Sequence, residues 1–440
     1  IGAADTERGI AKTDFKLVPR RVSYDHDPEA GVLLTRAEFE GYTDESTSCD
    51  GDPPPGLDWI EMPPPPMPPP VWIPPLPDPT GTVIEPGAEM VYVTGVGMGI
   101  WYTPDGGLSW YDISDEHSGE KGYDLKAWKP SADPLLDEIV LWWVADGYIH
   151  YSPDGGQSWT VRSPGGPATM FRAVEPRHTD ADTCYALGLD AAKERVYLYR
   201  TQDAGLNWTY VEVSRWLADY HYTIPEHSYP YRLVVNSNAS YVFLCLSHIA
   251  ELQGDYDYID VVRFNPDLTG EVVYYNNLGT YPGYYLSMVC KNAWPSDDPW
   301  LFGIDWDSDF VLKGNSWGSW YESRKPNDGE QKISLLLPRF TAPTGAKWGY
   351  TAFDGATKNL YELVEDDTSW SWTKYAGVLP FDTRAGGRGY PDEDVLWIGR
   401  ASTGTPHLQR SGDGGLTWQE RSTGITPSDA EITAIAVIKA

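Results

Sequence analysis

Three stretches in the middle of the chain combine aromatic and carboxylate side chains, a mixture that suits sugar chemistry. Aromatic rings stack on the apolar faces of sugars, and carboxylates accept hydrogen bonds from sugar hydroxyls. Two carboxyl groups roughly 5–10 Å apart could also hydrolyse a glycosidic bond, one as acid and the other as base or nucleophile. The ligand-binding candidates in these stretches are Trp216, Tyr220, His221, Tyr222, Tyr256 and Trp306. The candidates for a hydrolytic pair are Asp255, Asp257, Asp305 and Asp307.

The same stretches also have a purely structural interpretation, as solvated acidic loops with Tyr and Trp packed at strand ends. Arg172 and Arg232 each follow an aromatic residue and are candidates for binding an anion, although such residues commonly pair with acidic neighbours. In the preceding repeat, we expect Lys126 to occupy the position that corresponds to Arg172. Asp307 and Asp309 could hold Ca²⁺, but their spacing matches no complete calcium loop. We therefore expect no cofactor and no metal site.

The overall charge narrows the choice of partners. The chain has 440 residues and a formal net charge of −31, so it repels phosphate backbones and anionic membranes. No apolar run is long enough to span a bilayer, and we expect no nucleic-acid binding and no membrane insertion. The chain starts at Ile1 rather than Met, which is expected of a processed product or a fragment.

The four cysteines, Cys49, Cys184, Cys245 and Cys290, show no CxxC spacing, which argues against a zinc site. Buried free thiols are the favoured interpretation, and a disulfide is left open.

A repeated motif determines the expected fold. Four segments share the pattern Ser/Thr, any residue, Asp, any residue, Gly, any residue, Ser/Thr/Asn, Trp. Their Asp and Trp residues are Asp105 and Trp110, Asp154 and Trp159, Asp203 and Trp208, and Asp413 and Trp418. The Asp carboxylate can accept hydrogen bonds from the backbone of its own turn, Gly supplies unusual backbone angles, and Trp opens the next strand and packs into the core. We interpret these Asp residues as structural rather than catalytic.

The spacing of the motif predicts seven repeats. The first three copies recur every 49 residues, and degenerate copies follow near Asp267, Asn315 and Asp367 before the last intact one. Within one repeat, strands are expected at 123–129, 138–144 and 148–152, with a fourth from Ser158. Four short strands per repeat are typical of the blades of a β-propeller. The segment 431–438 supplies the strand that the first repeat, from Met90, lacks, so we expect it to close the ring.

The stretch from Glu89 to Trp110 resembles the Asp-box (BNR-like) propellers. That group includes sialidases, xyloglucan-active glycoside hydrolases, sortilin-type receptors and photosystem II assembly factors. The resemblance covers about residues 87–440 and implies an all-β, seven-bladed propeller of four-stranded blades, closed by the C-terminal strand, rather than one activity.

Individual branches of the group fit less well. This chain resembles sialidases in having arginines after an aromatic residue, in Phe171-Arg172 and Tyr231-Arg232. Sialidases also have an Arg-Ile-Pro motif before the first Asp box and six blades, and this chain matches neither feature. The xyloglucan hydrolases use two facing propellers, and this chain has room for one. The assembly factors carry a basic patch that an acidic chain does not offer.

The N-terminal part is different in kind. We expect a hairpin arm over residues 1–49, with strands at 15–24 and 31–42, then a proline-rich linker over 50–86 and the propeller over 87–440. The proline-dense run favours polyproline II and acts as a spacer or a strap, with docking to an aromatic groove as the alternative. A lone hairpin is marginal in water, so the arm is expected to contact another chain or domain. It faintly resembles the last strands of phage tail-tip domains.

Three functional hypotheses follow. The first is a non-enzymatic extracellular, cell-surface or virion-associated propeller that binds a glycan or a protein. The second is a glycoside hydrolase that uses the paired carboxylates. The third is a structural assembly module whose arm makes the contact.

Overall fold

The computed structural model of this chain consists of two compact units, Ile1–Trp72 and Ile73–Ala440. It describes residues 17–27, 32–41, 89–129, 138–177, 180–192, 195–213, 222–223, 232–235, 241–250, 256–269, 271–278, 289–290, 301–305, 310–314, 320–324, 332–337, 346–353, 358–365, 370–381, 383–388, 395–405 and 407–439. In the first unit, β1 (Leu17–Asp27) and β2 (Val32–Gly41) pair antiparallel as the expected hairpin. The proline-rich linker lies outside the described residues.

The second unit consists of antiparallel sheets, most of them four-stranded, which confirms the predicted all-β class. Sheet 1 contains β31 (Ile432–Lys439), β3 (Glu89–Gly95), β4 (Ile100–Thr103) and β5 (Tyr111–Asp112). Sheet 2 contains β6 (Gly122–Trp128), β7 (Val140–Ala145), β8 (Tyr148–Ser152) and β9 (Thr160–Arg162). Sheet 3 contains β10 (Met170–Arg177), β11 (Asp180–Leu189), β12 (Val196–Thr201) and β13 (Trp208–Glu212). A 3-10 turn, η2 (Asp115–His117), lies between sheets 1 and 2 along the chain.

Four more sheets follow along the chain. Sheet 4 contains β14 (Tyr222–Thr223), β15 (Arg232–Val235), β16 (Val242–Ala250), β17 (Tyr256–Phe264) and β18 (Glu271–Leu278). Sheet 5 contains β19 (Val289–Cys290), β20 (Leu301–Asp305), β21 (Phe310–Gly314) and β22 (Trp320–Arg324). Sheet 6 contains β23 (Lys332–Leu337), β24 (Ala346–Phe353), β25 (Lys358–Glu365) and β26 (Trp370–Val378). Sheet 7 contains β27 (Thr383–Arg388), β28 (Leu396–Arg400), β29 (Leu408–Ser411) and β30 (Gln419–Glu420).

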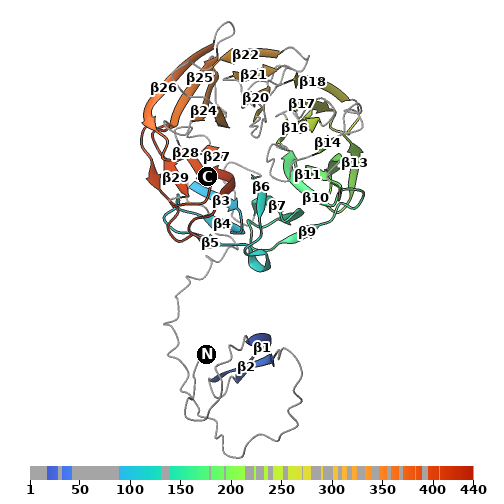
Figure 1. The fold of residues 1–440 in the computed structure, drawn as a ribbon, viewed down its shortest axis with the longest axis vertical. Coiled ribbons are helices and arrows are strands. Elements are labelled where there is room, and N and C mark those ends of the chain that lie inside the picture. Colours follow the sequence, from blue (N-terminus) through green and yellow to red (C-terminus); the bar gives the residue numbers. More distant parts are fainter. Residues whose placement is uncertain are drawn as a thin grey trace, which may run out of the picture. The chain divides into compact units, whose positions relative to one another are not determined.

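Each sheet contacts the next one along the chain, and sheet 7 contacts sheet 1. The first strands make most of these contacts, with β6 against β31 and β10, β10 against β15, β23 against β27, and β27 against β31. The succession can be followed in Figure 1 from β3 to β29. An antiparallel meander of four strands, repeated side by side in this way, is the arrangement of a β-propeller.

The strand order defines two faces of this unit. The third and fourth strands of each sheet are joined at one end, which we name the turn face because it carries the Asp turns. The second and third strands are joined at the other end, where the chain also passes to the next sheet; we name this end the loop face. The turn Asp146-Gly147 between β7 and β8 therefore lies on the loop face, as does the connection that contains η2.

The apolar core lies between neighbouring sheets. Separate clusters of buried side chains fill the spaces between sheets 7 and 1, 1 and 2, 2 and 3, and 3 and 4. In β7, Trp143 belongs to the cluster against sheet 1, and the adjacent Trp142 belongs to the cluster against sheet 3. Successive side chains of a strand point to opposite faces, so a strand with both faces covered reads as an uninterrupted apolar run. This explains the sequence from 139 to 144.

The four intact motifs form the same hydrogen-bonded turn. In the first, Asp105 Oδ1 accepts from the Thr103 hydroxyl at 2.8 Å and from the Ser109 N–H at 2.9 Å, and Oδ2 accepts from the Ser109 hydroxyl at 2.5 Å. The same bonds recur around Asp154, Asp203 and Asp413. Two consecutive residues after each Asp have positive φ, for example 67° at Gly106 and 82° at Gly107, which only glycine adopts easily.

The tryptophan of the motif packs against a core cluster, as expected, although it is not fully buried in every copy. Trp110 is buried, but Trp159, Trp208 and Trp418 are only half-buried. Trp110 Nε1 donates to the Arg421 carbonyl, just after sheet 7, at 2.6 Å, and Trp159 Nε1 donates to the Ile113 carbonyl, just after sheet 1, at 2.6 Å. In these two copies the motif fastens its sheet to the preceding one, whereas Trp208 Nε1 donates to the Gly205 carbonyl of its own turn at 2.9 Å.

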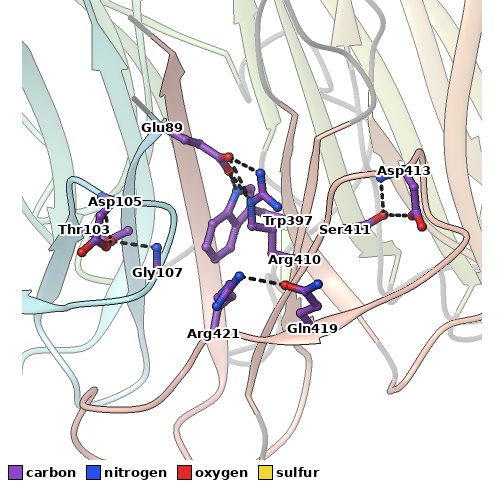
Figure 2. A network of polar contacts seen from close by, with 10 residues as sticks. All are labelled: Glu89, Thr103, Asp105, Gly107, Trp397, Arg410, Ser411, Asp413, Gln419 and Arg421. Atoms are coloured by element: carbon purple, nitrogen blue, oxygen red, sulfur yellow. Dashed lines mark hydrogen bonds and ion pairs between the residues drawn. The ribbon is translucent and has the colours of Figure 1, made fainter. Parts of the chain in front are cut away.

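Sheets 7 and 1 meet at a seam that joins the two ends of this unit. Strand β31 pairs with β3, with Val91 opposite Val437 and Val93 opposite Ile435, as expected for the C-terminal strand. Across the seam, Glu89 accepts hydrogen bonds from Arg410 Nε at 3.0 Å and Nη2 at 2.7 Å, and from the indole N–H of Trp397 (Figure 2). The rings of Trp397 and Trp110 pack edge to face, with centroids 6.2 Å apart. Polar and aromatic contacts therefore fasten the last sheet to the first.

Candidate functional site

A β-bulge recurs near the loop face in the first strands of five sheets. The extra residue is Thr433 in β31, Tyr123 in β6, Arg172 in β10, Ser334 in β23 and Arg384 in β27. A bulge leaves one residue out of the ladder and re-aims its side chain, and bulges are frequent at barrel rims and beside binding sites. The register thus places one unpaired residue of each of these sheets near the loop-face end of its first strand.

The bulges correct one sequence-based match. Lys126 was paired with the place of Arg172, but the register makes Tyr123 the counterpart of Arg172, because each is the unpaired residue of its strand. Lys126 lies further along β6, opposite Trp142. Its ammonium is 3.3 Å from Asp124 and 3.4 Å from Glu175, so it pairs with acidic neighbours.

Arg172 lies against Tyr123 across the junction of sheets 2 and 3. Its guanidinium carbon is 4.1 Å from the centroid of the Tyr123 ring, a cation–π geometry. Its Nη1 donates to the Phe171 carbonyl at 3.2 Å. Among the described residues, Arg172 has no carboxylate partner. A half-buried guanidinium held in place by a ring can accept a carboxylate or sulfate group of a ligand.

An exposed ring belongs to the loop-face turn that is bonded to the start of β10. The Phe171 N–H donates to the Gly147 carbonyl at 2.8 Å, which ties the start of β10 to the loop-face turn of sheet 2. Tyr148 follows Gly147 and leaves 57% of its surface exposed. The loop-face turn of sheet 2 therefore presents an exposed aromatic ring, and this turn is bonded to the strand that carries Arg172.

A second cluster lies on the loop face between sheets 1 and 2. His117 ends η2, Glu120 precedes β6, and His150 lies in β8. His117 Nδ1 is 2.8 Å from Glu120 Oε1, and His150 Nε2 is 3.3 Å from Glu120 Oε2. The two imidazole rings pack edge to face, with centroids 4.4 Å apart. Two imidazoles and one carboxylate therefore converge, a donor set that suits transition metals.

The electrostatics keep one of these imidazoles neutral. Burial, together with the neighbouring His117, lowers the pKa of His150 to about 4, while backbone hydrogen bonding at Ala145 acts in the opposite direction. At neutral pH the His150 ring is uncharged, and a neutral imidazole has a lone pair to offer. The ring also packs on the buried Trp143, with centroids 4.8 Å apart.

The sequence-predicted ligand residues fall into three groups. Arg172 is described in full. Tyr222 and Tyr256 occupy one row of sheet 4, because both are in register with Ala250, and Asp257 lies in the next row opposite Ile249. Arg232 is in register with Cys245, and Asp305 ends β20 opposite Phe310. The residues that lie outside the described part are Trp216, Tyr220, His221, Asp255, Trp306, Asp307 and Asp309. The predicted carboxylate pair therefore stays a prediction.

The Asp-turn carboxylates are engaged by their own turns. Hydrogen bonds from Asn207 lower the pKa of Asp203 to about 2, and those from Thr417 lower the pKa of Asp413 to about 2. A general acid near neutral pH needs the opposite shift. These residues remain assigned to structure.

Among the described cysteines whose side chains are placed, Cys184 is a buried free thiol, and burial raises its pKa. Cys245 and Cys290 lie in strands β16 and β19, and Cys49 lies outside the described residues.

The His117–Glu120–His150 cluster was missed by the sequence analysis, which expected no metal site. The signal is weak, because His117 and Glu120 are three residues apart in an irregular connection and His150 belongs to a different strand. The three side chains come together only because the strand at 148–152 packs beside the connection that leaves sheet 1.

No protein-family model matches the chain, and no curated protein matches its sequence. Several solved structures are similar in fold. YCF48 from Cyanidioschyzon merolae is 15% identical, the alignment covers 71% of this chain and 86% of that one, and the TM-score is 0.40. A Bacteroides fragilis protein assigned as a 6-phosphogluconolactonase is 11% identical over 80% of this chain and 98% of that one, with a TM-score of 0.47. An ancestral GH74 enzyme is 12% identical, the alignment covers 76% of this chain and 61% of that one, and the TM-score is 0.28.

At these identities the similarities concern the fold alone, and they identify neither substrate nor partner. The described part of the chain contains no helix with the length and apolarity needed to cross a membrane.

Proposed function

We propose that the seven sheets form one closed, seven-bladed Asp-box propeller and that its loop face binds an acidic ligand, a glycan or a protein, without catalysis. An extracellular, cell-surface or virion-associated setting, with the N-terminal arm contacting another chain or domain, belongs to the same proposal.

The observation that carries the proposal is Arg172. It is the bulge residue of β10, it stacks on Tyr123 at 4.1 Å, and no carboxylate among the described residues pairs with it. Lys126 shows the contrasting case of a cation already paired with Asp124 and Glu175. A pre-positioned guanidinium offers the charge-assisted hydrogen bond that an acidic sugar needs, and the exposed Tyr148 of the neighbouring loop-face turn is the stacking surface that belongs to the proposal.

The aromatic candidates of sheet 4 extend the proposed surface. The register that aligns Tyr222 with Tyr256 supports a shared row at the end where β16 meets β17. Trp216, Tyr220, His221 and Trp306 belong to the proposal on sequence grounds. Arg384, the bulge residue of β27, is the corresponding position in sheet 7 and a further candidate contact.

The expected result of changing Arg172 to Ala is a loss of binding. A charge-assisted hydrogen bond is worth about 1.5–3 kcal/mol, so affinity for an acidic ligand should fall roughly 10- to 100-fold. The measurement is a screen of the full chain on an array of acidic and neutral glycans, followed by titration of the hits. Arg177→Ala, at the turn-face end of the same strand, is the matched control and should bind as the unmodified chain does.

Acidic glycans that bind the Arg172→Ala variant as tightly as the unmodified chain would remove Arg172 from the site and with it the support for this function. Hits whose glycosidic bonds are cleaved during the titration would favour the hydrolase hypothesis instead.

A further inference from the structure

The connection between sheets 1 and 2 contains a cluster that the proposed binding surface does not use. We propose that His117, Glu120 and His150 form a binding site for a divalent transition metal, with Zn²⁺ as the best-fitting ion. The inference is independent of what the loop face binds.

The chemistry of the donors favours zinc. Zn²⁺ is bound by imidazole nitrogen and carboxylate oxygen at about 2.0–2.2 Å, and a set of two histidines and one glutamate is a known zinc donor set. Hard cations such as Ca²⁺ and Mg²⁺ require mainly oxygen ligands, which this cluster does not supply. The ligand atoms all lie within 4.8 Å of one another.

The distances need only small adjustment. Donors around a tetrahedral zinc ion lie about 3.3 Å apart, which follows from bond lengths near 2 Å. His150 Nε2 and Glu120 Oε2 are already 3.3 Å apart, and the 2.8 Å between His117 Nδ1 and Glu120 Oε1 would widen slightly.

Unsatisfied polar atoms point to a missing partner. His150 is only 1% exposed, and within the described part of the chain neither of its ring nitrogens makes a hydrogen bond of good geometry, although the backbone of Ala145 lies close enough to act on its pKa. Glu120 Oε2 is buried without a partner of good geometry as well. The close approach of His150 Nε2 and Glu120 Oε2 does not meet hydrogen-bond geometry. Buried polar atoms left unpaired cost about 1–3 kcal/mol each, so such atoms facing one another call for a cation between them.

The surroundings hold the ligands in place. Trp143 packs on the His150 ring and donates its indole N–H to Thr94 Oγ1 at 3.0 Å. The backbone around Glu120 is fixed by the Glu120 N–H to the His117 carbonyl, 3.2 Å, and by the Gly99 N–H to the Glu120 carbonyl, 3.2 Å. On the outer side, the exposed Glu116 carboxylate lies 3.9 Å from His117 Nε2, beyond hydrogen-bond distance, so it adds negative charge near the cluster without holding the ring.

A metal at this site would link two segments of the loop face and would keep one coordination position open to solvent. A metal bound here ties the connection that follows sheet 1 to the third strand of sheet 2, and so holds part of the loop face. The Glu120 side chain is 24% exposed, so a fourth position, toward solvent, is left for water or a ligand group.

The test is metal binding by the full chain after treatment with a chelator and dialysis. Titration with Zn²⁺ against a chromophoric competitor should give one tight site per chain, and Co²⁺ should give the visible absorption of a tetrahedral site. Addition of Zn²⁺ should raise the melting temperature, and EDTA should reverse the rise.

Glu120→Gln is the decisive variant, since its side chain is 24% exposed, and His117→Gln, at a buried position, is the second; the folding of both can be checked by circular dichroism. Each should weaken Zn²⁺ binding at least about 100-fold, because even outer partners of a metal site change affinity 10- to 100-fold. Glu116→Gln is the control, because it removes a nearby exposed charge but no ligand and no hydrogen bond, and Zn²⁺ affinity should stay within about tenfold of the unmodified chain. His150→Gln should abolish the site if it folds. Absence of a tight site in the unmodified chain, or Zn²⁺ binding and thermal shift equal in Glu120→Gln, would overturn the proposal.

Discussion

Changing Glu89 to Gln should destabilise the protein by about 3 kcal/mol. The Glu89 carboxylate is 7% exposed, accepts two hydrogen bonds from Arg410 and one from Trp397, and joins sheet 1 to sheet 7. Removing one partner of such a pair leaves a poorly solvated guanidinium without its counter-ion. The Arg410 side chain keeps 23% of its surface exposed, which places the loss at the lower end of the 3–5 kcal/mol range for buried pairs.

The measurement is the free energy of unfolding from denaturant titration, with Glu420→Gln as the control. Glu420 lies in exposed β30 of the same seam region, so its change should cost less than about 0.5 kcal/mol. A Glu89→Gln variant as stable as this control would mean that the seam ion pair does not hold sheets 7 and 1 together.

The second large effect is expected for Trp397→Ala, at about 4–5 kcal/mol. Trp397 is fully buried, packs edge to face on Trp110 and donates to Glu89, so truncation leaves a cavity and removes one donor. Trp142 is its counterpart in sheet 2: it is also fully buried and packs edge to face on Trp208 with centroids 6.2 Å apart. Within the part of the chain that the structure describes, its indole N–H has no hydrogen-bond partner.

The two tryptophans allow a matched comparison with phenylalanine. Trp142→Phe keeps most of the ring and loses no hydrogen bond, whereas Trp397→Phe also loses the hydrogen bond to a carboxylate. The difference between the two losses, measured by denaturant unfolding, should be about 1.5–3 kcal/mol, the value of a hydrogen bond to a charged group. Equal losses would show that the bond between Trp397 and Glu89 contributes nothing to stability.

The repeat predicted much of the local structure because each motif carries its own hydrogen bonds. The strand at 148–152 coincides with β8, and the segment 431–438 differs from β31 by one residue at each end. The fourth strand of sheet 2 begins at Thr160 rather than Ser158, because Ser158 is held by Asp154 in the turn. Local chemistry therefore placed the hairpins well.

Contacts between sheets were harder to predict because they join residues distant in the sequence. Glu89 and Arg410 are 321 positions apart, and nothing in the motif marks either residue. The half-burial of Trp159, Trp208 and Trp418 depends on the neighbouring sheet. The candidate site was also hard to predict, because no residue pattern indicates where the bulges lie. The bulges make Tyr123, rather than Lys126, the counterpart of Arg172. The His117–Glu120–His150 cluster likewise required the placement of a loop against a strand.

Everything proposed for the loop face depends on a closed ring, because an open ring would not hold the bulge residues of successive sheets around one centre. The direct measurement is disulfide formation between cysteines placed at Val91 and Val437, which are opposite one another in β3 and β31. Paired residues of antiparallel strands have Cα atoms about 4.5–5.5 Å apart, within the range that a disulfide spans. Cysteines at Val91 and the exposed Val161 form the control pair. We predict that mild oxidation of the folded Val91→Cys, Val437→Cys variant gives the 91–437 link, identified by peptide mass spectrometry, and that the control pair gives none. A folded variant that forms no 91–437 link would contradict the closure of the ring.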